Sequence, residues 1–110
     1  MTELDEIKKY LPLSESTCYI LLCLAEGPLH GYGIMQKTEA LSGGLVKIGP
    51  GTLYGAFSVL EKEGLIVMAE SRDRQKRYSL TAKGRRILAA QINRLEALTR
   101  SGQAVLPFLR

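Results

Sequence analysis

The sequence lacks most of what an enzyme or a membrane protein needs. It has one histidine, His30, and it contains no glycine-rich phosphate loop, paired metal ligands or Ser-His-Asp set. Its longest apolar run, Cys18 to Ala25, is far shorter than the roughly 20 residues that span a bilayer. No basic start followed by an apolar run and a small-residue cleavage site opens the chain. We therefore expect a cytoplasmic protein that is not an enzyme, binds no metal or cofactor and has no membrane partner.

Cysteine is also scarce, and both copies lie in that apolar run. Cys18 and Cys23 are five residues apart, so on a helix their side chains point in different directions. This spacing favours neither a local metal pair nor an easy disulfide. We expect buried free thiols, with a redox sensor as the alternative.

The chain has 110 residues, 45% of them hydrophobic, which suits one domain with a modest core that a second subunit would help to bury. The net charge of +4 is unevenly distributed. Residues 1–70 carry a balance of −4, whereas residues 71–86 carry +6. The basic residues of that segment are Arg72, Arg74, Lys76, Arg77, Lys83, Arg85 and Arg86. Such a concentration favours a polyanionic partner, with a solvated surface as the alternative.

Helix signals dominate the first half of the chain. Residues 1–11 are charged and predict a loose helix or arm. Ser14 is typical of an N-cap, and the very apolar helix that follows is expected to end at Gly27-Pro28. A second helix is expected from His30 or Gly31 to the Ser42-Gly43-Gly44 stop, and residues 45–48 then have β character.

The segment from Pro50 to Glu63 predicts an amphipathic helix with an unusual start. Proline suits the first turn, and Gly64 is a typical stop. At about 100° per residue, one side is apolar and expected in the core, namely Leu53, Ala56, Phe57 and Leu60. The other side carries Gly55, Ser58, Val59 and Lys62, with Thr52 and Tyr54 flanking it. Glycine at position 55 lowers the stability of the helix by about 1 kcal/mol relative to alanine. Its presence suggests that another molecule or segment approaches the backbone closely there.

Two β-rich stretches joined by a polar turn follow Gly64 and predict a hairpin with a basic tip. Tyr78 and Leu80 are expected on one face, with Arg77 and Ser79 on the other. Thr81 then caps a final helix that is expected to run towards Pro107. Apolar residues recur in it at intervals of seven, weakened by a threonine and a glycine, which predicts either a dimer seam or packing on its own domain. The candidate seam residues are Leu88, Ile92, Leu95, Leu98 and Leu106.

The order of elements predicts a mainly α fold with a small β-hairpin, a winged helix-turn-helix. Residues 1–80 would form the DNA-binding domain and residues 81–110 the dimerisation helix. In such motifs the second helix enters the major groove, which here is the helix from Pro50 to Glu63. The candidate DNA contacts are Thr52, Tyr54, Gly55, Ser58 and Lys62 on that helix, and Arg72, Arg74, Lys76 and Arg77 on the wing. Alternatively, Tyr54 packs against the first helix, and Gly55 permits a close helix–helix contact.

Three strings, HGYGI, GPGTLYGAFSVLEKEGLI and RQKRYSLTAKG, together resemble the PadR-like transcriptional regulators over residues 13–84. The resemblance implies a winged-helix domain on double-stranded DNA, a homodimer built through the C-terminal helix, and usually repression. Thr52 and Tyr54 match the family's recognition-helix motif, and residues 72–77 match its basic wing. His30, Gly31 and Tyr32 match a signature that we interpret as structural. The family often has proline where this chain has Gly55.

Two further implications remain open at the level of sequence. Compact members of the family bind small hydrophobic effectors at the dimer interface, often against a tryptophan; this chain has none, so an effector is allowed but not indicated. The alternative function is a winged-helix protein-interaction or dimerisation module without DNA binding, which the acidic first 70 residues favour. Salt-dependent binding to arbitrary duplex DNA distinguishes the two functions.

Overall fold

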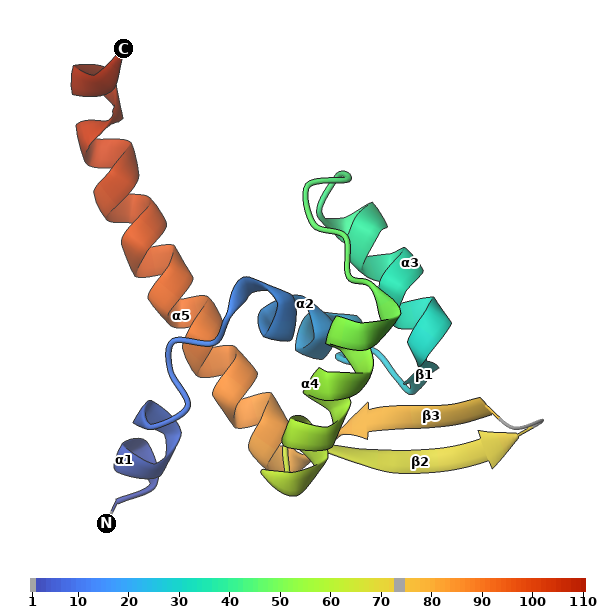
Figure 1. Ribbon diagram of the computed structural model, residues 1–110. Coiled ribbons are helices and arrows are strands. Elements are labelled where there is room, and N and C mark those ends of the chain that lie inside the picture. The colour runs from blue at the N-terminus through green and yellow to red at the C-terminus, as the bar shows by residue number, and fades with distance from the viewer. Residues whose placement is uncertain (1, 73–74) are drawn as a thin grey trace.

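The computed structural model describes residues 2–72 and 75–110. Over these residues the elements are α1 (Glu3–Lys8), α2 (Glu15–Cys23), β1 (Leu29–His30), α3 (Gly31–Leu41), α4 (Pro50–Lys62), β2 (Ile66–Arg72), β3 (Gln75–Leu80), α5 (Ala82–Val105) and the 3-10 helix η1 (Leu106–Leu109). Figure 1 shows α2, α3 and α4 gathered beside the sheet while α5 projects away from them. The expected mainly α fold with a small β-hairpin is therefore confirmed.

The sheet has three antiparallel strands in the order β1-β3-β2. β2 and β3 form the predicted hairpin, here called the wing, in register from Ile66 opposite Leu80 to Arg72 opposite Gln75. The third strand was not expected: Leu29 and His30 pair with Tyr78 and Arg77. Burial alternates along β3 as predicted, and Tyr78 and Leu80 are its buried residues.

The β character expected for residues 45–48 is wrong, because this segment has no regular secondary structure. Gly43 and Gly44 turn the chain with positive φ angles. Ser42 then engages both backbone groups of Val46: its hydroxyl accepts from the amide at 3.0 Å and donates to the carbonyl at 3.2 Å. Because these groups bond locally, they are not available to a strand partner.

One helix end differs from expectation, and the structure decides between the two alternatives for the N-terminal residues. α2 ends at Cys23, before Gly27-Pro28, because the amides of Leu24 and Ala25 bond to the carbonyls three residues back and tighten the last turn. Of the helix or arm expected at the N-terminus, the structure shows the helix: residues 3–8 are helical, with Thr2 and Asp5 making a capping box. α1 is held on α5 by an ion pair between Glu3 and Arg86 at 3.0 Å.

α2 runs through the centre of the core, where Ile20, Leu21 and Leu24 are fully buried. Cys18 and Cys23 are buried free thiols, which confirms the prediction from their spacing. Burial raises the pKa of both thiols; at Cys18 the nearby Glu15 adds to this, whereas at Cys23 Thr38 and Lys37 oppose it.

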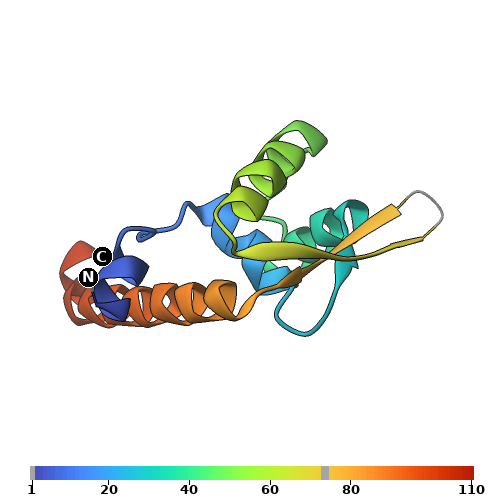
Figure 2. The same cartoon turned by 90° about the horizontal axis from the view of Figure 1, so that it is seen from below.

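The junction of α4, β2 and α5 fixes the end of α4 against the rest of the domain. Gly64 ends α4 with a φ of 77°, and the amides of Gly64 and Leu65 bond back to Glu61 and Leu60, as in a Schellman motif. The hydroxyl of Thr81 donates to the Gly64 carbonyl at 2.6 Å. Seen from below, the wing and the far end of α5 extend in opposite directions from this junction (Figure 2).

Candidate nucleic-acid interface

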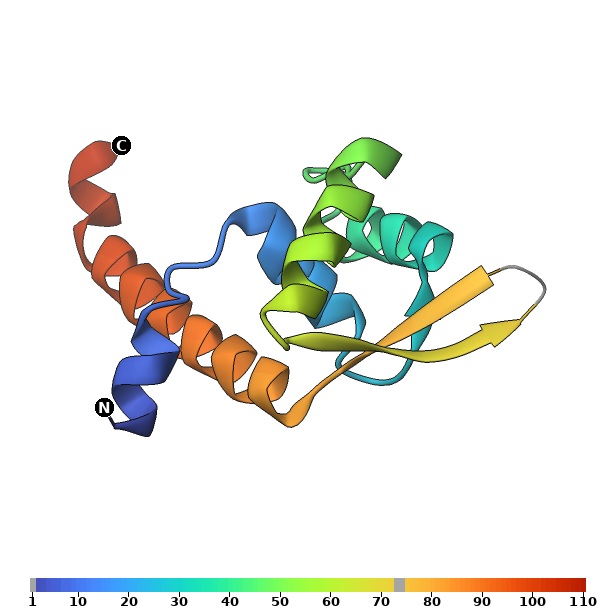
Figure 3. The ribbon, with the colours of Figure 1, turned by 60° about the horizontal axis from the view of Figure 1, so that its bottom comes forward.

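α4 has one face in the core and one in solvent, as its periodicity predicts. Leu53, Phe57 and Leu60 are at most 5% exposed. The residues of this helix expected to meet DNA are all exposed, namely Thr52, Tyr54, Gly55, Ser58 and Lys62. Figure 3 shows α4 running down to the base of the wing. The two candidate DNA-binding elements are therefore neighbours in space.

Gly55 has no role in the packing of its own chain. A Cβ built on this residue would have no described heavy atom within 4 Å. The alternative that Gly55 permits a close helix–helix contact is therefore wrong. The cost of a glycine in the middle of a helix, about 1 kcal/mol, is not offset by any contact among the described residues.

The start of α4 differs from that of the other α-helices in the described part of the chain. The N-cap is Gly49, which makes no side-chain hydrogen bond, and Pro50 occupies the first turn. The other four α-helices begin with a side-chain cap, from Thr2, Ser14, His30 and Thr81. Free backbone N–H groups at the start of α4 lie in solvent and suit a negatively charged ligand.

The Tyr54 side chain packs against neighbouring residues and is still largely exposed to solvent. Its ring packs edge-on against Phe57, with 5.8 Å between centroids, and its hydroxyl lies beside Gly31. A Cβ at Gly31 would come within 3.1 Å of both the Tyr54 hydroxyl and Leu53. Tyr54 is nevertheless 56% exposed. Tyr54 thus packs on the start of α3 instead of the first helix, and Gly31 has the structural role expected of it.

The end of α4 is held by residues that the sequence did not identify. The ammonium group of Lys83 donates to the carbonyl of Glu63 at 2.8 Å and lies 4.7 Å from the centre of the Tyr10 ring. The Tyr10 hydroxyl donates to the Glu63 carboxylate at 3.3 Å. Tyr10 follows α1, Glu63 is the C-cap of α4 and Lys83 lies in α5, so no local pattern connects them.

The wing carries the remaining candidate contacts. Arg74 lies outside the described residues, and for Arg72 only the backbone, at the end of β2, is described. Lys76 is exposed, on the same face of β3 as Tyr78. Arg77 lies on the opposite face, where its Nε is 3.3 Å from a carboxylate oxygen of Glu70. The charge of Arg77 is thus partly offset within its own chain.

The basic segment 71–86 is not one continuous patch. Arg85 donates to the carbonyl of Ala25 at 3.2 Å, and Arg86 pairs with Glu3. Together with Lys83, these residues belong to the first turns of α5 and hold the domain together. Of the basic side chains of this segment that the structure describes, Lys76 and Arg77 are the two that lie on the wing.

α5 divides into a buried and an exposed portion. Its first turns pack in the core, and the amide group of Gln91 bonds to both backbone groups of Leu13, at 3.2 and 3.3 Å. Leu88 is 5% exposed because it packs in the core of its own chain. Its assignment to a dimer seam is therefore wrong. Residues 92–110 are exposed throughout, including the other four seam candidates, Ile92, Leu95, Leu98 and Leu106.

Among the described residues, no group of three or more His, Cys, Asp or Glu side chains could hold a metal ion. No helix in residues 2–72 or 75–110 is both long and apolar enough to cross a membrane.

The arrangement of α3, α4 and the wing is a winged helix-turn-helix. A comparison with known protein families identifies the family within this fold. Residues 20–90 match the sequence model of the PadR-like family of transcriptional regulators. The chain belongs to this family. As a PadR-like protein it falls among transcriptional regulators rather than enzymes, and the three strings quoted above all lie within the matched residues.

Individual relatives agree with this assignment. A transcriptional regulator from Clostridium thermocellum has a similar structure, with a TM-score of 0.72 and 26% identity over 94% of this chain and 97% of that one. PadR of Bacillus subtilis, solved in complex with operator DNA, gives a TM-score of 0.63 and 25% identity over 69% of this chain and 45% of that one.

A relative by sequence is an uncharacterized 37.1 kDa protein in transposon TN4556 of Streptomyces fradiae. It is 37% identical over 86 residues, or 78% of this chain. The match spans only 24% of that protein's length.

Proposed function

We propose that this PadR-like protein is a sequence-specific repressor that binds operator DNA as a homodimer. α4 would lie in the major groove and the wing would contact the backbone. The observation that carries the proposal is the exposed face of α4, where Thr52, Tyr54, Ser58 and Lys62 surround a glycine, Gly55, that makes no packing contact with the described residues. A similar fold bound to operator DNA in Bacillus subtilis PadR supports it.

The proposed DNA contacts divide by chemistry. Lys62 and the basic residues of the wing would bind phosphates, which supplies affinity without sequence information. Thr52 would reach base edges from the first turn of α4, where recognition helices read the groove, and Ser58 would do so from the third turn of the same exposed face. The hydroxyl of Ser58 already donates to the Tyr54 carbonyl at 3.3 Å, which leaves its lone pairs free to accept from a base.

The proposed dimer would form through the exposed portion of α5. Seven large apolar side chains lie in residues 92–110 at exposures of 36% or more: Ile92, Leu95, Leu98, Val105, Leu106, Phe108 and Leu109. Such a surface on a projecting helix is expected to be covered in solution. A second copy of the chain would cover it and would present two recognition helices to two half-sites. The comparisons give no support to a small hydrophobic effector, and the proposal does not include one.

Selection of bound sequences from random duplex DNA tests the function, followed by affinity measurements on the selected site at several salt concentrations. We expect a site with two related halves and a logarithm of affinity that falls linearly with the logarithm of salt concentration. Failure to enrich any sequence, together with no salt-dependent binding to arbitrary duplex, would favour the interaction module without DNA binding.

A further inference from the structure

The start of α5 is bonded to the end of α4 through three successive backbone carbonyls. Lys83 Nζ donates to the carbonyl of Glu63 at 2.8 Å, and the Thr81 hydroxyl donates to the carbonyl of Gly64 at 2.6 Å. The amide of Thr81 donates to the carbonyl of Leu65 at 3.1 Å. We call these contacts the α4–α5 joint. They tie the proposed recognition helix directly to the helix of the proposed dimer.

Lys83 is the residue of the joint that connects three parts of the chain. Its half-buried side chain bonds to the C-cap of α4, and its ammonium group lies 4.7 Å from the centre of the Tyr10 ring, just after α1. The Tyr10 hydroxyl in turn donates to the Glu63 carboxylate at 3.3 Å. Carbonyls at a helix C-terminus carry partial negative charge, so a cation from another element stabilises that end.

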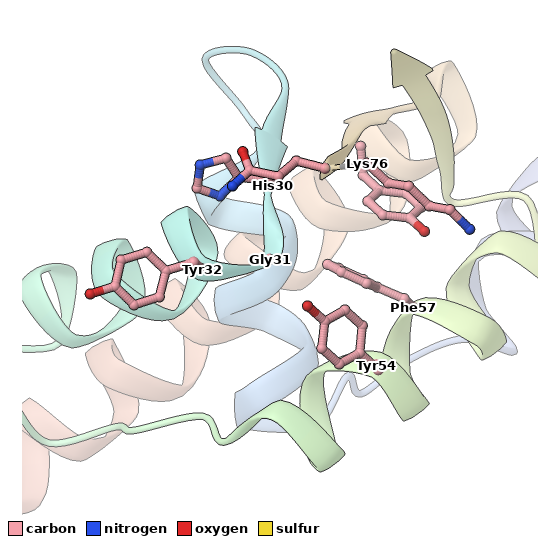
Figure 4. A pocket seen from close by; sticks show the side chains of 8 residues that line it. His30, Gly31, Tyr32, Tyr54, Phe57 and Lys76 are labelled. Carbon is pink, nitrogen blue, oxygen red and sulfur yellow. The ribbon is translucent and has the colours of Figure 1, made fainter. Parts of the chain in front are cut away.

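The start of α4 is held in a different way. No side chain caps it, and the Tyr54 and Phe57 rings lie beside Gly31 of α3 on one wall of a cavity of about 360 Å³ (Figure 4). Among the described residues, no side-chain hydrogen bond joins the first turns of α4 to another element. The hydrogen-bonded attachment of α4 to the rest of the domain is therefore at its end, through the joint.

α5 leads from the joint to the proposed dimer surface without interruption, because Ala82–Val105 is one helix. From Thr81 to Leu98, which is 69% exposed, the helix rises about 26 Å at 1.5 Å per residue. A tilt of about 10° between α4 and α5 would therefore move Leu98 by roughly 4–5 Å relative to α4. This displacement exceeds the rise of one base pair, about 3.4 Å. A small change at the joint is thus large on the scale of DNA.

We propose that Lys83 determines which spacing of half-sites the dimer accepts. It fixes the angle between α4 and α5, and a two-fold dimer repeats this angle in both protomers, so the angle sets the distance between the two recognition helices. Lys83 is a positioning residue, since its ammonium group contacts the Glu63 carbonyl and the Tyr10 ring of its own chain. The inference rests on the proposed function, namely binding of operator DNA as a homodimer through α5.

The test measures binding of the full-length protein to duplexes that carry the two selected half-sites at the selected spacing, with one base pair added between them, or with one removed. One base pair shifts the second half-site by about 3.4 Å and rotates it by about 35°. We expect the parent to bind the altered spacings at least about 30-fold more weakly than the selected one. Lys83→Met keeps an unbranched apolar side chain and removes the ammonium group, and it should reduce this ratio to about fivefold or less.

Two further measurements separate a change of angle from the loss of a DNA contact. Lys83→Met should bind a duplex with a single half-site as tightly as the parent does, because the exposed face of α4 is unaltered. The salt dependence of that binding should also be unaltered, whereas the loss of a phosphate contact would reduce the slope by about 0.9.

Lys9→Met is the matched control. The ammonium group of Lys9 also lies over the Tyr10 ring, 5.3 Å from its centre, but Lys9 makes no contact with α4 among the described residues. This variant should discriminate between spacings as the parent does. Thermal unfolding shows whether each variant folds. If Lys83→Met does not fold, Tyr10→Phe replaces it, because it removes only the hydroxyl bonded to Glu63; its spacing ratio should be about threefold below that of the parent.

The failures of the inference and of the proposed function are distinguishable. If the parent binds no duplex, or selects a site without two related halves, the proposed function fails. If the parent binds its site but accepts all three spacings equally, or if Lys83→Met discriminates as strongly as the parent, the function stands and the joint does not set the spacing. If Lys83→Met binds the single half-site more weakly with a smaller salt slope, Lys83 is a phosphate contact and the inference is wrong.

Discussion

Replacing Gly55 with alanine should make the protein more stable and a poorer DNA binder at the same time. The residue is sixth of the thirteen in α4, on its exposed face, and a Cβ there would contact nothing within 4 Å. The full difference in helix propensity, about 1 kcal/mol, should therefore appear as added stability. For a domain of this size that corresponds to a rise in melting temperature of about 4–8 °C.

The same methyl group would lie on the face that we place against the duplex. Glycine permits a close approach of the backbone to a ligand, and a Cβ would push the helix away from the groove. We expect the affinity for the selected site to fall about tenfold, or roughly 1.4 kcal/mol. Thermal unfolding and equilibrium titration, performed on the same preparation, measure the two effects independently.

A second glycine provides the contrast. Gly84 lies in the first turn of α5, where a Cβ would overlap the carbonyl of Leu65 and come within 3.2 Å of Leu80. Overpacking against backbone costs about 1–3 kcal/mol, which outweighs the gain in propensity. Gly84→Ala should therefore lower the melting temperature. If Gly55→Ala is less stable than the parent, or is more stable and binds with undiminished affinity, our explanation of this glycine is wrong.

The remaining predictions concern the core, the dimer and the thiols. Phe57→Ala should cost about 3–5 kcal/mol of unfolding free energy in denaturant titrations, whereas Lys62→Ala should leave stability within about 0.5 kcal/mol and weaken binding to all duplexes alike. Leu98→Glu should yield folded monomers in light scattering, because this side chain is 69% exposed; a folded dimer would reject the seam. Burial raises the pKa of the Cys18 thiol above its ordinary value of 9.0. The stability that this buried thiol contributes should therefore be complete below pH 9 and be lost as the pH rises further. A free energy of unfolding that is independent of pH in this range would contradict the prediction.

Periodicity and capping signals were enough to predict the elements that have a strong local pattern. α4 and its two faces, the cap at Thr81 and the stop at Gly64 follow from residue types at fixed spacing, and the structure confirms them. The strand at residues 29–30 was missed because two residues carry no period, and they become a strand only by pairing with β3. The β character expected for residues 45–48 is wrong for a different reason. A single serine side chain makes local hydrogen bonds to the backbone of this segment, so these groups do not pair with a strand.

The candidate site shows the same limit. The exposure of Ser58 and Lys62 could be predicted from angles around one helix. The heptad pattern could not separate Leu88, which its own core buries, from Leu95, which solvent surrounds, because spacing along a helix does not say where the domain ends.

The central claim is that α4 reads the major groove of duplex DNA. Its most direct test is to replace each purine of the selected site in turn by its 7-deaza analogue, which removes only the major-groove N7 acceptor, and to measure the affinity. If α4 reads the major groove, affinity should fall at a few positions in each half-site, and it should not fall when inosine replaces guanine and removes only the minor-groove amino group. Sensitivity to inosine alone, or to neither change, would contradict it.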